Sequence, residues 1–378
     1  MKNKDKQPSE SRRDLLTRLA QEPSPPTTDA MLDETVGDRL LKLGISRRGF
    51  MQFCAGMASM MALPASIVPR MAFAAANAKP SVIYMSFQEC TGCLESLVNS
   101  SVVTNAKSTT VENLFLNVLS VEYQETLMAA AGSQAEEWRH KVMAQNAGSF
   151  VLVVDGSIPK DAGSGYFVSG GKSGVLRFVE AAEQAGLIIA LGTCASFGGL
   201  PNADPNPTGA VSVGELMSIQ GINKPLINVS GCPPIAEVIT GVIMYYLTPG
   251  LGMPQLDSLK RPRMFYGETI HDECYRKDYF EEGLFAETFD DAGARRGYCL
   301  LHLGCKGPIT GNACSTVKWN NRTSFPMQSG HGCLGCAQPY FWDGGVTTAR
   351  ANPKPFWRNG SVKSTSFYSA LPRGSFDD

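Results

Sequence analysis

From residue 81 onward, short apolar runs alternate with longer segments whose apolar residues recur at helical spacing. The apolar runs are of strand length and contain few polar residues, which indicates strands buried on both faces. We expect strands at 81–87, 114–123, 150–154, 187–191 and 225–229, and helices at 125–145, 175–184 and 235–246. This alternation predicts an α/β fold with a doubly wound parallel sheet over roughly residues 80–250.

The N-terminal segment has a different pattern. Residues 1–45 are polar and charged, the pair Arg47-Arg48 follows, and no charge then occurs from Gly49 to Pro69. Small residues at 72–78 offer several A-x-A cleavage sites. Twin arginines, a mildly apolar stretch and such sites predict a Tat export signal over residues 1–74, cleaved within 74–78, and hence a periplasmic protein.

A transmembrane anchor is the alternative interpretation of this uncharged stretch, because it is just long enough to span a bilayer. Its weak hydrophobicity and its two prolines, Pro64 and Pro69, favour the export signal. No later segment has the length of a transmembrane helix, so we expect the mature chain to have none of its own. Any membrane association would then depend on a partner.

Composition narrows the class of protein. The chain has 378 residues, a formal net charge of −1 and 43% hydrophobic residues. The balance of charge argues against a nucleic-acid partner, and the apolar content argues against a disordered protein. The 11 cysteines are too few for a disulfide scaffold of this length and too many for an ordinary enzyme, which makes metal ligation the first hypothesis.

Four cysteines lie just after predicted strands. Cys90 and Cys93 follow the first strand, Cys194 follows the strand at 187–191, and Cys232 follows the strand at 225–229. Because the carboxyl ends of parallel strands meet at one edge of a sheet, these thiols are expected to converge there. The set fits an iron–sulfur site, and the Cys-Pro-Pro sequence and scattered spacing favour it over the alternative, a structural zinc.

Beyond Pro254 the sequence is rich in glycine and aromatic residues and shows little periodicity. A histidine and six cysteines crowd into this part of the chain: His271, Cys274, Cys299, Cys305, Cys314, Cys333 and Cys336. Disulfides are the alternative for an exported protein in which ten cysteines remain after the signal is removed. Two C-x2-C pairs and a Tat signal favour a cofactor inserted before export, so we expect ligands to hold this region together.

Several motifs together resemble the small subunit of periplasmic NiFe hydrogenases. They are ECTGC, GTCASFGG, NPTGA, GCPP, HDEC, CLLHLGC, GNAC and SFPMQSGHGCLGC, and they span essentially the whole mature chain. The resemblance implies a flavodoxin-like domain at 75–253, an iron–sulfur domain at 254–345 and a polar C-terminal tail at 346–378. It also implies a role in the reaction H2 ⇌ 2 H+ + 2 e−, in which this chain relays electrons from a large subunit with the Ni-Fe centre to an acceptor such as a cytochrome or membrane redox protein.

The resemblance further implies three ligand sets, which use all ten remaining cysteines and one histidine. A proximal 4Fe-4S cluster would be held by Cys90, Cys93, Cys194 and Cys232; a distal 4Fe-4S cluster by His271, Cys274, Cys299 and Cys305; and a medial 3Fe-4S cluster by Cys314, Cys333 and Cys336. Pro326 falls where relatives with a four-iron medial centre have a fourth cysteine. The Ni-Fe site, and with it the catalytic residues, is expected on the partner chain.

Three further expectations concern the surroundings of the clusters. Oxygen-tolerant relatives have two extra cysteines near the proximal cluster, and here those positions resemble Gly92 and Gly199, which implies an ordinary, oxygen-sensitive enzyme. Glu89, beside Cys90, is a candidate for the subunit interface or for proton movement. The polar tail implies that this chain has no C-terminal membrane helix.

Two other functions remain open at this point. One is a cluster-bearing subunit of a complex I-like enzyme, which would have the sheet but lack the cysteine-rich C-terminal block. The other is a periplasmic interaction protein stabilised by disulfides or zinc, which would contain no iron.

Overall fold

The computed structural model describes residues 47–77, 80–99, 101–104, 107–110, 120–320 and 322–343. The predicted stretch 1–46, residue 78 at the expected cleavage site and the predicted tail 346–378 lie outside these residues. None of the described helices has the length and apolar character needed to span a bilayer.

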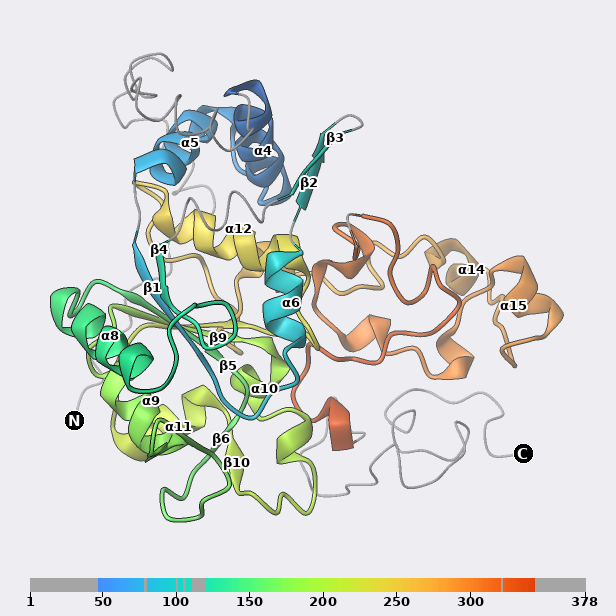
Figure 1. Ribbon diagram of the computed structural model, residues 1–378. Coiled ribbons are helices and arrows are strands. Elements are labelled where there is room, and N and C mark those ends of the chain that lie inside the picture. Colours follow the sequence, from blue (N-terminus) through green and yellow to red (C-terminus); the bar gives the residue numbers. More distant parts are fainter. Residues whose placement is uncertain are drawn as a thin grey trace, which may run out of the picture.

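A five-stranded parallel sheet forms the centre of the molecule (Figure 1). Its strands, in spatial order, are β11 (Leu226–Val229), β9 (Leu187–Leu191), β5 (Val151–Asp155), β1 (Ser81–Ser86) and β4 (Ser120–Tyr123). In order along the chain this is 2-1-3-4-5, the order of flavodoxin-like folds. The predicted fold class is therefore confirmed, and the point where the strand order reverses lies between β1 and β5.

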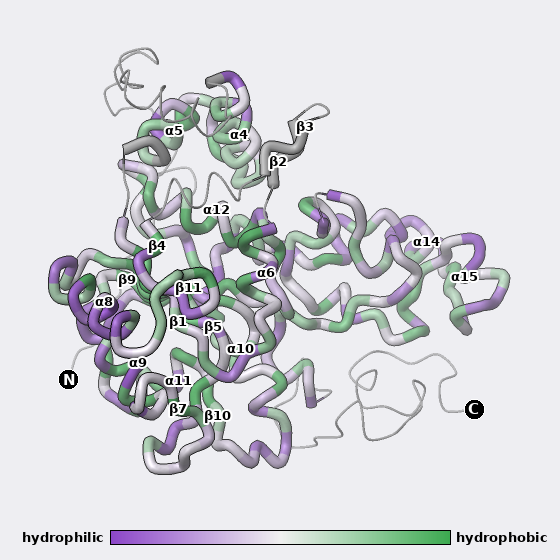
Figure 2. The backbone as a smooth tube through the Cα atoms, in the orientation of Figure 1, coloured by the Kyte–Doolittle hydropathy of each residue, from purple (hydrophilic) through white to green (hydrophobic). Residues whose placement is uncertain are grey.

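Helices cover both faces of the sheet because successive strand residues point to opposite sides. On one face, Val82, Tyr84 and Val153 pack with α6 (Gly92–Val98) and α12 (Ala236–Leu247). On the other, Ile83, Leu152 and their neighbours pack with α8 (Gly132–Gln145), α9 (Gly174–Ala182) and α11 (Val213–Gln220). Figure 2 shows the hydrophobic colour along the central strands and a hydrophilic outer surface on α8.

The segment expected to be an export signal forms two helices, α4 (Arg47–Met60) and α5 (Val68–Asn77), which contact α12. Figure 1 shows the pair stacked beyond α12, away from the sheet. Its Phe50, Met57 and Met71 are at most 1% exposed. The apolar stretch that makes the segment a predicted signal is thus also apolar enough to pack on the folded domain, which the sequence interpretation did not anticipate.

The C-terminal unit, residues 254–343, is built from short elements. Its helices are α13 (Arg263–Tyr266), α14 (Lys277–Glu281) and α15 (Ala292–Arg296), joined by the 3-10 turns Leu301–Leu303, Gly307–Ile309, Ala313–Ser315 and Phe341–Asp343. Phe265, Leu300 and Phe325 of this unit belong to the same buried cluster as α12, so the unit shares a core with the sheet domain. Ligands were expected to replace a core here; in fact a shared apolar core is present as well.

Most predicted elements agree with the structure to within one or two residues. The main error is the helix expected at 125–145, which begins only at Gly132 because Gln124 and the following residues form a turn. The Gln124 side chain accepts hydrogen bonds from the backbone of Thr126 and Leu127, which holds the turn. The strand expected at 114–123 is described only over β4, since residues 114–119 lie outside the described residues.

Smaller elements include β2 (Ser101–Thr104), β3 (Lys107–Thr110), β6 (Ile158–Pro159), β7 (Val168–Ser169), β8 (Lys172–Ser173), β10 (Ala210–Val211), η1 (Ala65–Ile67) and η2 (Leu200–Asn202).

Candidate metal centres

Four cysteines meet at the carboxyl edge of the sheet, as the strand-end argument predicted. Cys90 lies in the loop after β1, Cys93 in the first turn of α6, Cys194 in α10 (Gly192–Phe197) after β9, and Cys232 in the loop after β11. Burial and the neighbouring thiols raise the pKa of Cys194 and Cys232 to about 12. All four lie just past the carboxyl ends of the parallel strands, at one edge of the sheet. We refer to them as the first ligand set.

Glycines let the backbone approach this set closely. A side chain at Gly192, whose φ is +84°, would collide with the sulfur of Cys93. A Cβ at Gly199 would lie 2.5 Å from the sulfur of Cys194, and its φ of +59° disfavours any larger residue. An additional cysteine at position 199 therefore does not fit the observed backbone.

Acidic side chains surround the first ligand set. Asp155, at the end of β5, is 1% exposed, and its Oδ2 accepts a hydrogen bond of 2.9 Å from the Tyr84 hydroxyl. Burial raises the pKa of Asp155 to about 7, and burial together with this carboxyl raises the pKa of Cys93. Burial likewise raises the pKa of Glu89, whose Oε2 is buried and has no hydrogen-bond partner among the described residues. Glu89 is thus a structural neighbour of the set, and its predicted interface or proton role is untested.

A second ligand set comprises His271, Cys274, Cys299 and Cys305. The backbone NH of Cys274 donates to the carbonyl of His271, and the NH of His271 donates to the carbonyl of Gly307, close to the Cys305 sulfur. Burial raises the pKa of Cys305 to about 11, and the thiols of Cys299 and Cys274 add to this. Burial also lowers the pKa of His271, which favours the neutral imidazole that a metal ligand requires.

A third ligand set comprises Cys314, Cys333 and Cys336 in the C-terminal unit, of which the first two are buried and Cys336 is partly buried. Burial and the Cys336 thiol raise the pKa of Cys314 to about 12, and Trp319 offsets part of this rise. Pro326 lies in a turn of the same unit, where its carbonyl accepts from the NH of His331.

The three sets adjoin one another through hydrogen bonds. The Thr193 hydroxyl, beside Cys194, donates to the Cys336 carbonyl, and the Ser230 hydroxyl, two residues before Cys232, donates to the Ala337 carbonyl. This links the first set to the third. The backbone NH of Cys333 donates to the Cys305 sulfur at 3.2 Å, which links the third set to the second. The ligands therefore run in one series from the sheet edge through the C-terminal unit.

The donor chemistry distinguishes between the metals considered from sequence. All eleven cysteines are free thiols. Among the described residues, no group of three His, Cys, Asp or Glu side chains has the arrangement of a single-ion site. Sets of three or four thiols, one of them with a histidine, have the donor chemistry that iron–sulfur clusters use.

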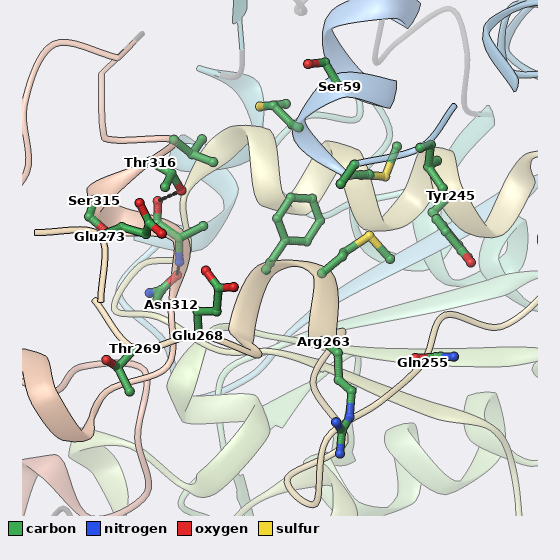
Figure 3. Close-up of a pocket in the computed structure, with 18 of the residues that line it drawn as sticks. Ser59, Tyr245, Gln255, Arg263, Glu268, Thr269, Glu273, Asn312, Ser315 and Thr316 are labelled. Atoms are coloured by element: carbon green, nitrogen blue, oxygen red, sulfur yellow. Dashed lines mark hydrogen bonds between the residues drawn. The ribbon is translucent and has the colours of Figure 1, made fainter. Parts of the chain in front are cut away.

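A cavity of about 560 Å³ lies apart from the ligands, between α4, α12 and the C-terminal unit. Figure 3 shows Ser59 and Tyr245 on one side of it and Glu268, Glu273 and Asn312 on the other. None of the predicted metal ligands lines it. It is therefore a feature of the packing between these segments rather than part of a metal centre.

Sequence reasoning missed several residues around the sets, mainly Lys306, Arg276, Tyr84 and Thr193. Lys306 is fully buried, and Arg276 is 6% exposed beside the second set. The position of Lys306 directly after a ligand and before a glycine was the available signal, but burial of its ammonium is decided by the fold.

Two family models match the chain. Residues 266–348 match the model for the C-terminal part of the NiFe/NiFeSe hydrogenase small subunit. Residues 90–246 match the model described as NADH ubiquinone oxidoreductase, 20 Kd subunit. The sheet domain is thus similar to the complex I-like subunit considered from the sequence. The cysteine-rich C-terminal block distinguishes this chain from that subunit.

Curated relatives and solved structures agree with the family match of the C-terminal part. The uptake hydrogenase small subunit of Azotobacter vinelandii is 44% identical over 85% of this chain and 87% of its own length. The hydrogenase-1 small chain of Citrobacter freundii is 42% identical over 90% of this chain and 88% of its own. The recombinant NiFeSe hydrogenase structure from Desulfovibrio vulgaris Hildenborough matches with a TM-score of 0.64 and 34% identity, covering 71% of this chain and 97% of that one.

Proposed function

This chain belongs to the small-subunit family of NiFe hydrogenases, and from that premise we propose that it carries electrons through three iron–sulfur clusters. As a small subunit it is one part of a hydrogenase heterodimer, an oxidoreductase acting on H2. When bound, the clusters supply the one-electron carriers through which the electrons of H2 ⇌ 2 H+ + 2 e− pass between the large subunit and an acceptor. The residues of this chain hold the carriers, tune them and exclude water from them.

We assign the first ligand set to a proximal 4Fe-4S cluster, the second to a distal 4Fe-4S cluster and the third to a medial 3Fe-4S cluster. The observation that carries the proposal is the continuity of the three sets, from Thr193 beside Cys194 to Cys336 and from Cys333 to Cys305. Electron transfer needs closely spaced carriers in sequence, and the order of ligands along this series supports that arrangement. The neutral imidazole of His271 replaces one thiolate of the second set, which removes a negative charge there and raises its potential.

The exposure of the first set supports docking of the large subunit at the sheet edge. Cys90 and Cys232 are exposed, whereas Cys299, Cys305, Cys314 and Cys333 are buried. A cluster held by exposed thiols needs a covering partner to exclude water. We infer that the large subunit, with the Ni-Fe centre, covers this edge and contacts Glu89, while a cytochrome or membrane redox protein receives electrons near the second set.

The surroundings of the first set support an ordinary four-cysteine cluster and hence an oxygen-sensitive enzyme. Gly199 leaves no room for a further cysteine, and a Cβ at Gly92 would lie 3.3 Å from the Cys90 sulfur. We further propose Tat export through Arg47 and Arg48, removal of residues 1–74 and a periplasmic location. Arg48 is exposed at the start of α4, which supports its access to a receptor.

Anaerobic co-purification tests the function directly. We expect a brown complex with a larger, nickel-containing chain, visible absorbance from iron–sulfur clusters, and an EPR signal from an oxidised three-iron cluster. A folded, colourless and iron-free chain would refute the electron-transfer proposal. Retention of the signal in periplasmic protein, or a cytoplasmic location, would refute the export proposal separately.

The assignment of the third set has its own test in Pro326→Cys. A fourth thiol is expected to convert the three-iron cluster to four irons, with loss of the three-iron EPR signal. Pro326→Ala serves as the control and should retain the signal. A fully reconstituted Pro326→Cys protein that keeps the three-iron signal would contradict the placement of Pro326 beside this set.

A further inference from the structure

Lys306 is a buried cation located between two ligand sets. It follows Cys305 of the second set, and its backbone NH donates to the carbonyl of Cys333 of the third set at 2.8 Å. The Thr310 hydroxyl donates to the Lys306 carbonyl, which fixes the turn. The residue is 0% exposed and is among the largest fully buried side chains described. Its backbone is therefore held between the two sets and its side chain is kept out of water.

The side chain of Lys306 interacts with the third set in particular. Burial lowers the pKa of its ammonium to about 8, and the Cys333 thiol is the group that raises it. The geometry agrees with this, because the hydrogen bond from the Lys306 NH to the Cys333 carbonyl holds the residue against the third set. Since the side chain is 0% exposed, its charge acts inside the C-terminal unit, where water does not screen it.

On the basis of the proposed function, we propose that Lys306 is a positioning residue whose buried positive charge raises the midpoint potential of the cluster held by Cys314, Cys333 and Cys336. Adding an electron makes such a cluster more negative, and a fixed positive charge nearby stabilises that reduced state. The effect is large because water, which would screen it, is excluded. Lys306 thereby favours transfer of electrons from the first set into the C-terminal unit.

Arg276 provides an internal comparison for the second set. Its guanidinium donates to the Tyr275 hydroxyl at 2.7 Å and to the Tyr298 carbonyl at 2.6 Å, and its backbone NH donates to the Cys274 sulfur at 3.5 Å. Burial raises the pKa of Cys274, and Arg276 partly offsets this increase. Removing the charge at position 276 should therefore change mainly the midpoint potential of the cluster held by the second set. Removing the charge at position 306 should change mainly that of the third.

The test is an EPR-monitored redox titration of the intact heterodimer carrying Lys306→Met. At a fixed ambient potential we expect the ratio of reduced to oxidised three-iron cluster to fall about tenfold, because a nearby unit charge is lost. Lys306→Arg should restore the ratio. Arg276→Met should change the midpoint potential of the cluster held by the second set and leave that of the three-iron cluster nearly unchanged. Lys260→Met, at an exposed lysine of the same unit, is the matched control and should shift neither.

The outcomes separate this inference from the proposed function. An intact three-iron signal with an unchanged midpoint in Lys306→Met overturns the role of Lys306. Absence of any cluster signal in the wild-type complex overturns the proposed function instead. If Lys306→Met loses the cluster and Lys306→Arg keeps it, charge at this position is required and the inference stands. Loss of the cluster in both variants shows that shape rather than charge is needed, and overturns it.

Discussion

The sheet domain and the C-terminal unit both present thiols, but they hold them by different means. The sheet domain has helices of up to 14 residues and a core on each face of β1, β5 and β9. In the C-terminal unit no described α-helix after residue 262 exceeds five residues. Regular elements can position ligands before a metal arrives, whereas short turns need the metal to remain in place. The first ligand set thus lies on regular elements, and the other two lie on short turns that share an apolar core with the sheet domain.

The two regions also differ in the charges beside their sulfur atoms. Asp155 and Glu89 lie near the first set, and Lys306 and Arg276 lie near the others. Backbone NH groups donate to the sulfurs of Cys305 and Cys333 in the C-terminal unit as well. Negative charge disfavours reduction, while positive charge and NH donors favour it. Under the proposed function, these charges favour movement of electrons from the sheet edge toward the C-terminal unit.

Removal of iron should separate the two regions most clearly. After oxidation and chelation, we expect backbone amides in 266–343 to exchange hydrogen at least about tenfold faster, because the ligands no longer cross-link the short elements. Amides of β5 and β9 should keep their protection, since their core contains no ligand on the face covered by α8 and α9. Hydrogen exchange measured by mass spectrometry checks this. Equal loss of protection in both regions would contradict the idea that only one depends on metal.

Glu136→Gln should destabilise the sheet domain by about 2 kcal/mol, because Glu136 pairs with the buried guanidinium groups of Arg139 and Arg177. Burial opposes ionisation of Glu136, but hydrogen bonds from Arg177 and Tyr123 outweigh it and lower the pKa to about 2. The carboxylate therefore contributes stability above about pH 4.5, and this contribution is lost as the pH falls toward 2.

Urea unfolding of the two proteins at several pH values measures this effect. The difference between wild type and Glu136→Gln should shrink on acidification, and the iron content should not change. Glu137→Gln, at the exposed neighbouring position on α8, is the control and should behave like wild type. A difference that grows as the pH falls would show that the network is not the source of the stability.

Asp155→Asn should raise the midpoint potential of the cluster held by the first set, whereas Lys306→Met should lower that of the third. Because burial raises the pKa of Asp155 to about 7, the titration is run at about pH 8, where the carboxylate is mostly ionised. Its loss favours reduction, so the ratio of reduced to oxidised cluster at a fixed potential should rise about tenfold. The amide oxygen can still accept from the Tyr84 hydroxyl, which preserves the packing. Redox titration followed by EPR checks the sign, with the exposed Glu183→Gln as control. A shift of the same sign in Asp155→Asn and Lys306→Met would refute the charge comparison.

The smallest effect is expected from Ser212→Ala, which removes an N-cap in the sheet domain. The Ser212 hydroxyl accepts from the backbone NH of Glu215 at 3.1 Å at the start of α11. Its loss should lower the free energy of unfolding by about 1 kcal/mol. Chemical denaturation measures this, and cluster absorbance should be unchanged because α11 lies on the face opposite α12. Loss of iron in this variant would mean that the regions are less independent than their cores suggest.

Sequence patterns predicted much of the molecule for identifiable reasons. Apolar strands such as 187–191 are recognisable because burial on both faces requires uninterrupted hydrophobic residues. Cys90, Cys194 and Cys232 could be grouped in advance, since parallel strands end at a common edge. Gln124 illustrates the limit, because its side chain replaces the first turns of an expected helix by hydrogen bonds that periodicity does not reveal.

By itself, the sequence determined the fold class, the family and the chemistry of the ligands, since these depend on local patterns and on residue types at fixed spacings. Only the tertiary structure decided that α4 and α5 pack on α12, that Thr193 bonds to the Cys336 carbonyl, and that Lys306 is buried with its NH on the Cys333 carbonyl. These contacts join residues far apart in the chain or depend on which side chains lose water. Burial sets the strength of a charge, and burial is a property of the packed molecule.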